Sequence, residues 1–310
     1  MGPWFEPRSG SQFLRILLTG CDGQVGCEIS RKAPGYGFDV IATDIGNLDI
    51  TDIDAIRRLQ GKHQTEIFIN AAAYTAVDKV ESEQQLAHDV NALGAKNLAT
   101  VARECNLPIL HISTDYIFSG NASTPYKDDS EPDPQGVYGV TKLAGERLVA
   151  QSNARHLTLR TSWVFGIDGQ NFVKTMLRLG SEKDEVSVVA DQFGSPTYAG
   201  HIATALLRLT EQYQQQGDLP WGNYNFCDND TTTWHLFATE IMRMGQAQGL
   251  LTKLPVVHPI RTEDYPTPAT RPLYSVLDCS LFEQTFPDIG ISSWQSGLRE
   301  MIGVLAGEGN

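Results

Sequence analysis

Short hydrophobic runs recur along the first half of the chain, and a stretch with helical periodicity separates each run from the next. Five runs predict strands at residues 15–19, 38–43, 66–70, 109–113 and 156–161. Strands that alternate with helices are joined by right-handed crossovers, so this order predicts a parallel sheet covered by helices on both faces. The pattern therefore predicts an α/β fold with a Rossmann-type doubly wound sheet.

The alternation loosens after Gly166. Further strands are predicted at 186–190 and 224–227, and a proline-rich stretch follows at 255–272. These features predict a smaller C-terminal lobe that is interleaved with late strands of the sheet and binds the substrate.

The pattern of predicted elements divides the chain into three parts. We expect a disordered extension over residues 1–13, a dinucleotide-binding Rossmann domain over 14–165, and mainly a substrate-binding lobe over 166–310. No linker rich in serine or glycine separates the last two parts, so their boundary is soft.

The formal net charge of −13 narrows the range of partners. An acidic protein repels polyanions, and no run of Lys or Arg offers a local exception, so no nucleic-acid partner is expected. No apolar run approaches the roughly 20 residues that span a bilayer, and residues 1–13 lack the order of a signal peptide. We therefore expect no membrane partner and a cytoplasmic location.

The five cysteines are scattered, and none forms a Cys-x-x-Cys pair. This usage indicates a reducing compartment. No carboxylates or imidazoles stand at ligand spacing in the sequence, so no metal site is expected.

A glycine-rich turn follows the first run. Gly20, Gly23 and Gly26 lie between that run and a helical pattern that begins near Gln24. Missing Cβ atoms let a pyrophosphate approach backbone N–H groups at the start of a helix. The alternative is an ordinary glycine-rich connection.

Asp44 closes the second run, where an acidic residue would accept hydrogen bonds from the adenosine ribose. Its carboxylate would repel a 2′-phosphate, and no Arg follows it immediately. The expected cofactor is NADH or NADPH, with a preference for NADH. A plain turn or helix cap is the alternative role for this residue.

Tyr138 and Lys142 stand four residues apart at the start of a long helical stretch, so their side chains share one helix face. An ammonium there, together with a positively charged nicotinamide, is expected to lower the pKa of the phenol and make Tyr138 a general acid or base. Thr114 ends the fourth run at the carboxyl edge of the sheet, where its hydroxyl can donate to a reacting carbonyl. Each feature alone occurs by chance; the three in this order rarely do.

These elements together resemble the extended short-chain dehydrogenase/reductase family and, within it, the dTDP-4-dehydrorhamnose reductases. The resemblance extends from Leu14 to about Leu305. The segments that carry it are 20–26, Asn70-Ala-Ala-Ala-Tyr-Thr-Ala-Val-Asp78, Ser113-Thr-Asp-Tyr-Ile-Phe118, Tyr138 to Lys142, Arg160-Thr-Ser-Trp163, Asp191-Gln-Phe-Gly-Ser-Pro-Thr197 and Arg271-Pro272.

The resemblance implies roles for individual residues. The implied catalytic set is Thr114, Tyr138 and Lys142. Besides the three glycines and the Tyr138–Lys142 pair, the residues implied to bind the cofactor are Gln24, Val25, Asp44, Asp49, Ile50, Ala72, Ala73 and Tyr74. Those implied to face the substrate are Thr114, Asp115, Trp163, Asn171 and Arg271. Without the resemblance, core packing for Trp163 and a surface ion pair for Arg271 would be the preferred roles.

The implied reaction is reduction of the C4 ketone of a dTDP-linked 4-keto deoxysugar, dTDP-4-dehydro-L-rhamnose, to dTDP-L-rhamnose. Related 4,6-dehydratases carry an acidic residue after Thr-Asp where this chain has Tyr116, so direct reduction alone is expected. Two alternatives stay open, a non-catalytic regulatory subunit similar to the β subunit of methionine adenosyltransferase and a reductase of another nucleotide-linked 4-keto sugar. A homodimer also stays open.

Overall fold

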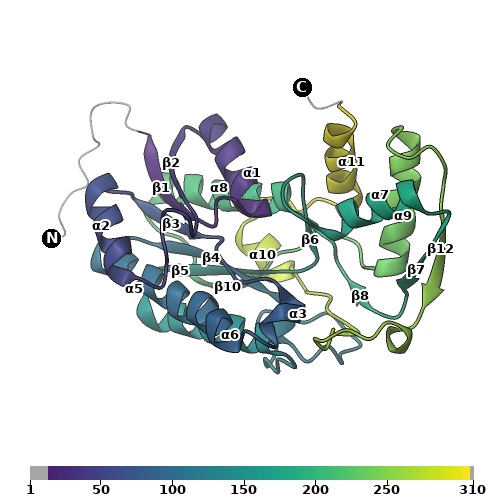
Figure 1. Ribbon diagram of the computed structural model, residues 1–310. Helices are drawn as coiled ribbons and strands as arrows, with labels where there is room; N and C mark the ends of the chain where they lie inside the picture. The colour runs from purple at the N-terminus through teal and green to yellow at the C-terminus, as the bar shows by residue number, and fades with distance from the viewer. Residues whose placement is uncertain (1–12, 308–310) are drawn as a thin grey trace.

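The centre of the protein is a parallel sheet of six strands in the order β10-β5-β4-β3-β1-β2 (Figure 1). The computed structural model describes residues 13–307, so the extension predicted at 1–13 lies, apart from Phe13, outside the described residues. The strands are β1 Leu14–Thr19, β2 Phe38–Thr43, β3 Ile67–Asn70, β4 Ile109–Thr114, β5 His156–Thr161 and β10 Gly222–Asn225. Every neighbouring pair is parallel, which confirms the predicted α/β fold class.

Helices cover both faces of the sheet because each strand presents apolar side chains alternately to both sides. Helices α1 (Gln24–Lys32) and α8 (Ala199–Gln216) pack together on one face. Helices α2 (Ile53–His63), α5 (Ala95–Glu104) and α6 (Val137–Ser152) cover the other face.

The direction of winding reverses between β1 and β3. From β1 the chain passes to β2 on one side, then returns to β3 on the other side. A crevice forms at such a switch point, outside the carboxyl ends of the strands, and ligands of doubly wound folds bind there.

A second hydrophobic core lies in the C-terminal half. Helices α7 (Phe172–Glu182), α9 (Trp234–Ala247) and α11 (Trp294–Leu305) enclose it with the parallel pair β7 (Glu185–Val189) and β12 (Val256–Ile260). Elements α8, β10 and α10 (Ser280–Thr285) nevertheless pack with the sheet. Residues beyond 166 therefore contribute to both cores.

The remaining elements are short and lie mostly in the connections. They are the helical segments η1 Ala33–Tyr36, α3 Val77–Val80, α4 Gln84–His88, the π-helix η2 Asp89–Gly94, η3 Asp115–Ile117 and η4 Thr262–Asp264, and the strands β6 Val164–Phe165, β8 Phe193–Gly194, β9 Thr197–Tyr198 and β11 Thr232–Thr233.

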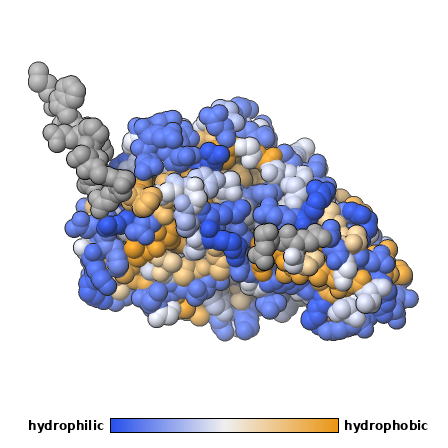
Figure 2. Space-filling view, turned by 90° about the horizontal axis from the view of Figure 1, so that it is seen from above, coloured by the Kyte–Doolittle hydropathy of each residue, from blue (hydrophilic) through white to orange (hydrophobic). Residues whose placement is uncertain are grey.

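The surface seen from above is mainly hydrophilic, and hydrophobic residues gather there in separate patches (Figure 2). Across residues 13–307, no helix combines the length and the apolar character needed to cross a membrane.

Candidate functional site

A crevice of about 550 Å³ opens at the switch point between β1 and β3. Eight residues predicted to bind the cofactor line it, and they are Gly20, Gly23, Asp44, Asp49, Ile50, Ala72, Ala73 and Tyr74. Strand-end loops that are remote in sequence therefore meet at one place, as the order of the strands requires.

The glycine turn is held tightly against the loop after β3. Gly20 has a φ of +77°, and a Cβ there would lie 2.5 Å from the backbone nitrogen of Ala72. A Cβ on Gly26 would lie 2.0 Å from the carbonyl oxygen of Gly20. Gly23 caps α1 without a side-chain hydrogen bond, and no acidic residue stands in the first turn of that helix. The N–H groups at the start of α1 are thus suited to an anionic pyrophosphate.

Five residues predicted to bind the cofactor do not line the crevice: Tyr138 and Lys142 lie at the start of α6, and the other three lie on the first turn of α1. Val25 is buried in the core beneath α1, and Gly26 is enclosed by the glycine turn. Gln24 turns toward the C-terminal half, where its Oε1 accepts a hydrogen bond of 3.0 Å from Asn171. Their position on the first turn of α1 follows from the sequence; the direction of each side chain depends on packing.

The Asp44 carboxylate is fixed by the turn it faces. One oxygen accepts from the backbone N–H of Asp22 at 3.0 Å and the other from that of Ile45 at 2.8 Å. Ligand atoms of Cys21, Asp22 and Asp44 lie within 4.8 Å of one another, a grouping that spacing in the sequence did not indicate. The geometry of the crevice nevertheless suits a ribose at Asp44.

Sequence reasoning missed the apolar lining of the crevice. Ile45, Leu48, Leu86 and Val90 lie along it with Ile50, and Ile45 is 72% exposed. Apolar side chains of this kind are suited to the faces of an aromatic base. The signal available in the sequence was an apolar residue directly after the strand-end Asp44.

Thr114, Tyr138 and Lys142 come together at the carboxyl end of β4 and the start of α6. The Thr114 hydroxyl donates to the Asp115 carboxylate at 2.9 Å and lies within hydrogen-bonding reach of Tyr138. The ring of Tyr116 packs edge-on against that of Tyr138, with 5.4 Å between their centroids. The phenol is therefore held beside a hydroxyl and a carboxylate.

The pKa of Tyr138 is shifted in the direction opposite to the one expected from the sequence. Burial raises the pKa of the phenol above its ordinary value of 10, and the charge of Asp115 raises it further, whereas the hydrogen bond to Thr114 lowers it. The predicted lowering of the Tyr138 pKa is wrong for the protein without cofactor, because the effect of burial exceeds that of the Thr114 hydrogen bond. The phenol is consequently protonated at neutral pH.

The Lys142 ammonium is buried, with 2% of the residue exposed, and donates to the backbone oxygen of Ile112 at 2.7 Å. Burial lowers its pKa from 10.5 to about 8, and Glu146 opposes this shift. Lys142 therefore titrates close to neutral pH, which suits a group that exchanges protons.

Asp115 is buried beside Thr114 and Tyr138, and burial raises its pKa from 3.8 to about 6. Its negative charge above that pH favours the protonated form of the neighbouring Tyr138. The site therefore favours proton donation by the phenol over proton removal.

A second pocket of about 310 Å³ opens beside Tyr116 and includes Arg271 in its lining. Arg271 forms an ion pair of 2.9 Å with Asp78, and both side chains are partly exposed. The guanidinium therefore lies in a pocket next to Tyr116, and the Asp78 carboxylate partly neutralises its charge.

Trp163 and Asn171 have extensive protein contacts. Trp163 adopts a φ of +47° and stacks on Trp234 with 3.6 Å between ring centroids. Asn171 caps α7 through the N–H of Lys174, and its amide donates to Gln24 and Gly166. Neither residue lines the pocket beside Tyr116, and their predicted roles in substrate binding stay predictions.

A doubly wound sheet with a glycine turn at its switch point and a Thr–Tyr–Lys group beside the crevice defines an oxidoreductase of the extended short-chain dehydrogenase/reductase type. Comparison with known proteins narrows this class. The family model described as RmlD substrate binding domain matches residues 14–306.

Named relatives agree with that match. A dTDP-4-dehydrorhamnose reductase of Aggregatibacter actinomycetemcomitans is 41% identical over 288 residues, which are 93% of this chain and 98% of the relative. The crystal structure of such a reductase from Clostridium acetobutylicum has a TM-score of 0.86 at 40% identity, covering 94% of this chain and 99% of that one. The Bacillus anthracis enzyme in complex with NADP has a TM-score of 0.85 at 33% identity, covering 94% and 99%. The chain belongs to the dTDP-4-dehydrorhamnose reductase family.

Proposed function

We propose that this protein reduces the C4 ketone of dTDP-4-dehydro-L-rhamnose to dTDP-L-rhamnose with NADH or NADPH. The main support for this proposal is the position of Tyr138. Its protonated phenol lies beside Thr114, next to a crevice suited to a dinucleotide. Membership of the reductase family supports the choice of sugar nucleotide.

The bound nicotinamide would supply hydride to the ketone carbon. The Thr114 hydroxyl, which donates to Asp115 in the protein alone, would turn to donate its proton to a hydrogen bond with the ketone oxygen, as its place at the end of β4 permits. The Tyr138 phenol would give its proton to that oxygen as negative charge develops on it. The raised pKa of Tyr138 suits this direction, because the acid must be protonated before hydride arrives.

The pocket beside Tyr116 would hold the nucleotide part of the substrate. Arg271 in its lining supplies a cation for a pyrophosphate, and Asp78 holds the guanidinium in place by an ion pair of 2.9 Å. Trp163, between β5 and β6, and Asn171, the N-cap of α7, would contact the substrate from the C-terminal half.

The preference for NADH over NADPH rests on Asp44. Its carboxylate lies in the crevice, held by the N–H of Asp22, where it would accept from ribose hydroxyls and repel a 2′-phosphate. A homodimer and a cytoplasmic location remain predictions from the sequence.

Reaction of the purified protein with dTDP-4-dehydro-L-rhamnose tests the proposal. NADH and NADPH consumption would be followed separately at 340 nm, and the product would be identified by NMR. We expect stoichiometric oxidation of the cofactor and dTDP-L-rhamnose as the product. Cofactor binding without oxidation would favour the regulatory-subunit alternative, and turnover only with another nucleotide-linked 4-keto sugar would overturn the choice of substrate.

A further inference from the structure

Two of the five cysteines, Cys227 and Cys279, lie in contact although they are 52 positions apart in the sequence. Cys227 follows β10 and is buried, whereas Cys279 precedes α10 and is partly exposed. The Cys279 sulfur accepts a hydrogen bond of 3.2 Å from the Cys227 N–H and lies within hydrogen-bonding reach of the Cys227 thiol. We call these two residues the thiol pair. Their sulfurs are near enough to bond after small side-chain rotations.

Polar groups surround the Cys227 sulfur. The Ser162 hydroxyl lies 3.2 Å from it, and the side chains of Cys279 and Thr197 lie within hydrogen-bonding reach. Burial opposes loss of the thiol proton, but these contacts together lower the pKa of Cys227 below its ordinary value of 9.0. The contact with Cys227 and burial raise the pKa of Cys279. The thiol pair therefore loses one proton more easily than the other, and the resulting anion is the form that reacts with an oxidant.

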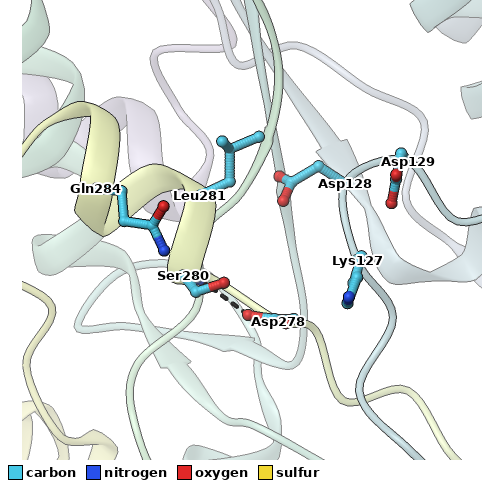
Figure 3. A pocket seen from close by; sticks show the side chains of 7 residues that line it. All are labelled: Lys127, Asp128, Asp129, Asp278, Ser280, Leu281 and Gln284. Carbon is cyan, nitrogen blue, oxygen red and sulfur yellow. Dashed lines mark hydrogen bonds between the residues drawn. The ribbon is translucent and has the colours of Figure 1, made fainter.

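A pocket of about 330 Å³ opens beside the thiol pair (Figure 3). Its lining includes Asp278 and Ser280, the residues on either side of Cys279. The Asp278 carboxylate accepts from the Ser280 N–H at 2.9 Å, which fixes the backbone around this cysteine. Because Cys279 is partly exposed and Cys227 is buried, a small oxidant that enters from solvent meets Cys279 first.

The segment 228–278 between the two cysteines carries much of the C-terminal half. It includes α9, β12 and Arg271, whose guanidinium lies in the pocket beside Tyr116. A bond between the cysteines would tie the two ends of this segment together and restrict its movement around a bound sugar nucleotide.

The contact between Cys227 and Ser162 gives the thiol pair a second connection to the C-terminal half. The Ser162 hydroxyl donates to the backbone oxygen of Ser195 at 2.7 Å, and the next residue, Trp163, has the left-handed φ of +47°. A Cys227 sulfur that turns toward Cys279 to bond it would leave Ser162 without its sulfur contact, beside this strained backbone. Both effects act on residues proposed to bind the sugar nucleotide.

We propose that the thiol pair is a modification site, at which a hydroperoxide forms a reversible disulfide that weakens binding of the sugar nucleotide. With hydrogen peroxide, Cys279 passes its proton to the Cys227 thiolate and attacks one peroxide oxygen. The O–O bond breaks, the other oxygen leaves as hydroxide and is protonated to water, and Cys279 becomes a sulfenic acid. The Cys227 thiol then attacks the Cys279 sulfur, so that the S–S bond forms, the S–O bond breaks and the oxygen leaves with the thiol proton as water.

The two thiols together lose two electrons, and the peroxide is reduced to water. A disulfide that forms and is reduced again is the kind expected in a reducing compartment. Formation of the disulfide is independent of the proposed reductase function, whereas its effect on the sugar nucleotide rests on that function.

Peptide mapping by mass spectrometry, after treatment of the purified protein with hydrogen peroxide, tests the modification. We expect a Cys227–Cys279 cross-link that dithiothreitol removes. Cys227→Ser should instead leave a sulfenic acid on Cys279 that dimedone traps, and Cys279→Ser should leave Cys227 unmodified. The matched control is Cys105→Ser, which removes an exposed cysteine at the end of α5 and should form the cross-link as the wild type does.

Steady-state kinetics of the oxidised and reduced protein test the effect on the substrate. We expect oxidation to raise the KM for dTDP-4-dehydro-L-rhamnose by about fivefold or more, a coupling typical of two linked sites, and dithiothreitol to restore it. The Kd for NADH should not change, and Cys279→Ser should not respond to peroxide.

Oxidation confined to Cys105, or a cross-link between Cys21 and Cys27 alone, would overturn the modification site. A cross-linked protein with an unchanged KM would overturn the effect on the substrate. Failure of the reduced wild-type protein to oxidise cofactor at all would instead refute the reductase function, and the mass spectra would still decide whether the cross-link forms.

Discussion

Tyr138 is the residue on which the proposed chemistry depends. Replacement by Phe removes the hydroxyl but keeps the ring that packs against Tyr116. We expect Tyr138→Phe to lower kcat by about 10²- to 10⁴-fold, because the developing oxyanion loses its proton donor. Binding of NADH, measured by calorimetry, should change little. Wild-type turnover in this variant would refute the role of the phenol.

Asp115 should make stability depend on pH. Its folded-state pKa is raised from 3.8 to about 6, so the buried carboxylate destabilises the fold as pH rises through that range. We therefore expect Asp115→Asn to raise the free energy of unfolding above pH 6 by up to about 3 kcal/mol, and the gain should vanish below about pH 4. Urea unfolding at several pH values measures this; a gain that is constant with pH would contradict it.

The sequence predicted which side chains are neighbours better than it predicted their electrostatics. Four-residue spacing places Tyr138 and Lys142 on one helix face in any helix, so their neighbourhood follows from the pattern. The sign of the Tyr138 pKa shift depends on burial and on Asp115, which are set by packing of separate segments. The apolar lining of the crevice was missed for the same reason.

The π-helix η2 contacts α6 at very short range. A Cβ on Gly145 of α6 would lie 2.1 Å from the carbonyl oxygen of Asn91. The Asn91 side chain in turn bonds the backbone of Tyr74 in the crevice and the Thr141 hydroxyl on α6. This contact therefore connects the crevice to α6, the helix that carries Tyr138 and Lys142.

The variant Gly145→Ala should reduce the free energy of unfolding by about 1–3 kcal/mol, because α6 must move away from η2. Gly61→Ala is the matched control, since Gly61 lies within α2 with no atom near its Cβ position. Higher helix propensity should stabilise that variant by about 1 kcal/mol. Chemical denaturation of both variants measures the contrast; equal effects would contradict the close contact.

Most strands were predictable as elements because their side chains are apolar on both faces. The strand β10 was predicted at 224–227 but lies at 222–225. Its polar residues Asn223 and Asn225 alternate with the apolar Tyr224, so the strand lacks the apolar run that the pattern requires. The π-helix has no periodic signal of its own and was not predicted.

Binding of the cofactor in the crevice should raise the free energy of unfolding of the whole molecule, because only the folded protein has the crevice. A ligand at 100 times its Kd adds about 2.7 kcal/mol to the free energy of unfolding. At equal concentration NADH should stabilise the wild-type protein more than NADPH, and Asp44→Ser should reduce or reverse the difference, because the carboxylate no longer opposes a 2′-phosphate. Unfolding measured with each cofactor tests this; equal stabilisation of wild type by both would contradict the role of Asp44.

The sequence indicated a parallel sheet and a C-terminal half with a less regular pattern. It did not indicate which of the later helices and strands pack with the sheet and which form the second core. Helix α8 and strand β10 return to the sheet, while α7, α9 and α11 enclose the second core. Which core each helix joins depends on packing between segments that are distant in the sequence, and the hydrophobic patterns of these helices are too similar to predict it.

Transfer of deuterium from the cofactor to the sugar would show whether the protein delivers hydride to the C4 ketone. The protein would be supplied with dTDP-4-dehydro-L-rhamnose and cofactor that carries deuterium at the transferable position of the nicotinamide, and the product would be analysed by NMR and mass spectrometry. We expect dTDP-L-rhamnose with a single deuterium at C4. Product without deuterium, or with deuterium at another carbon, would contradict it.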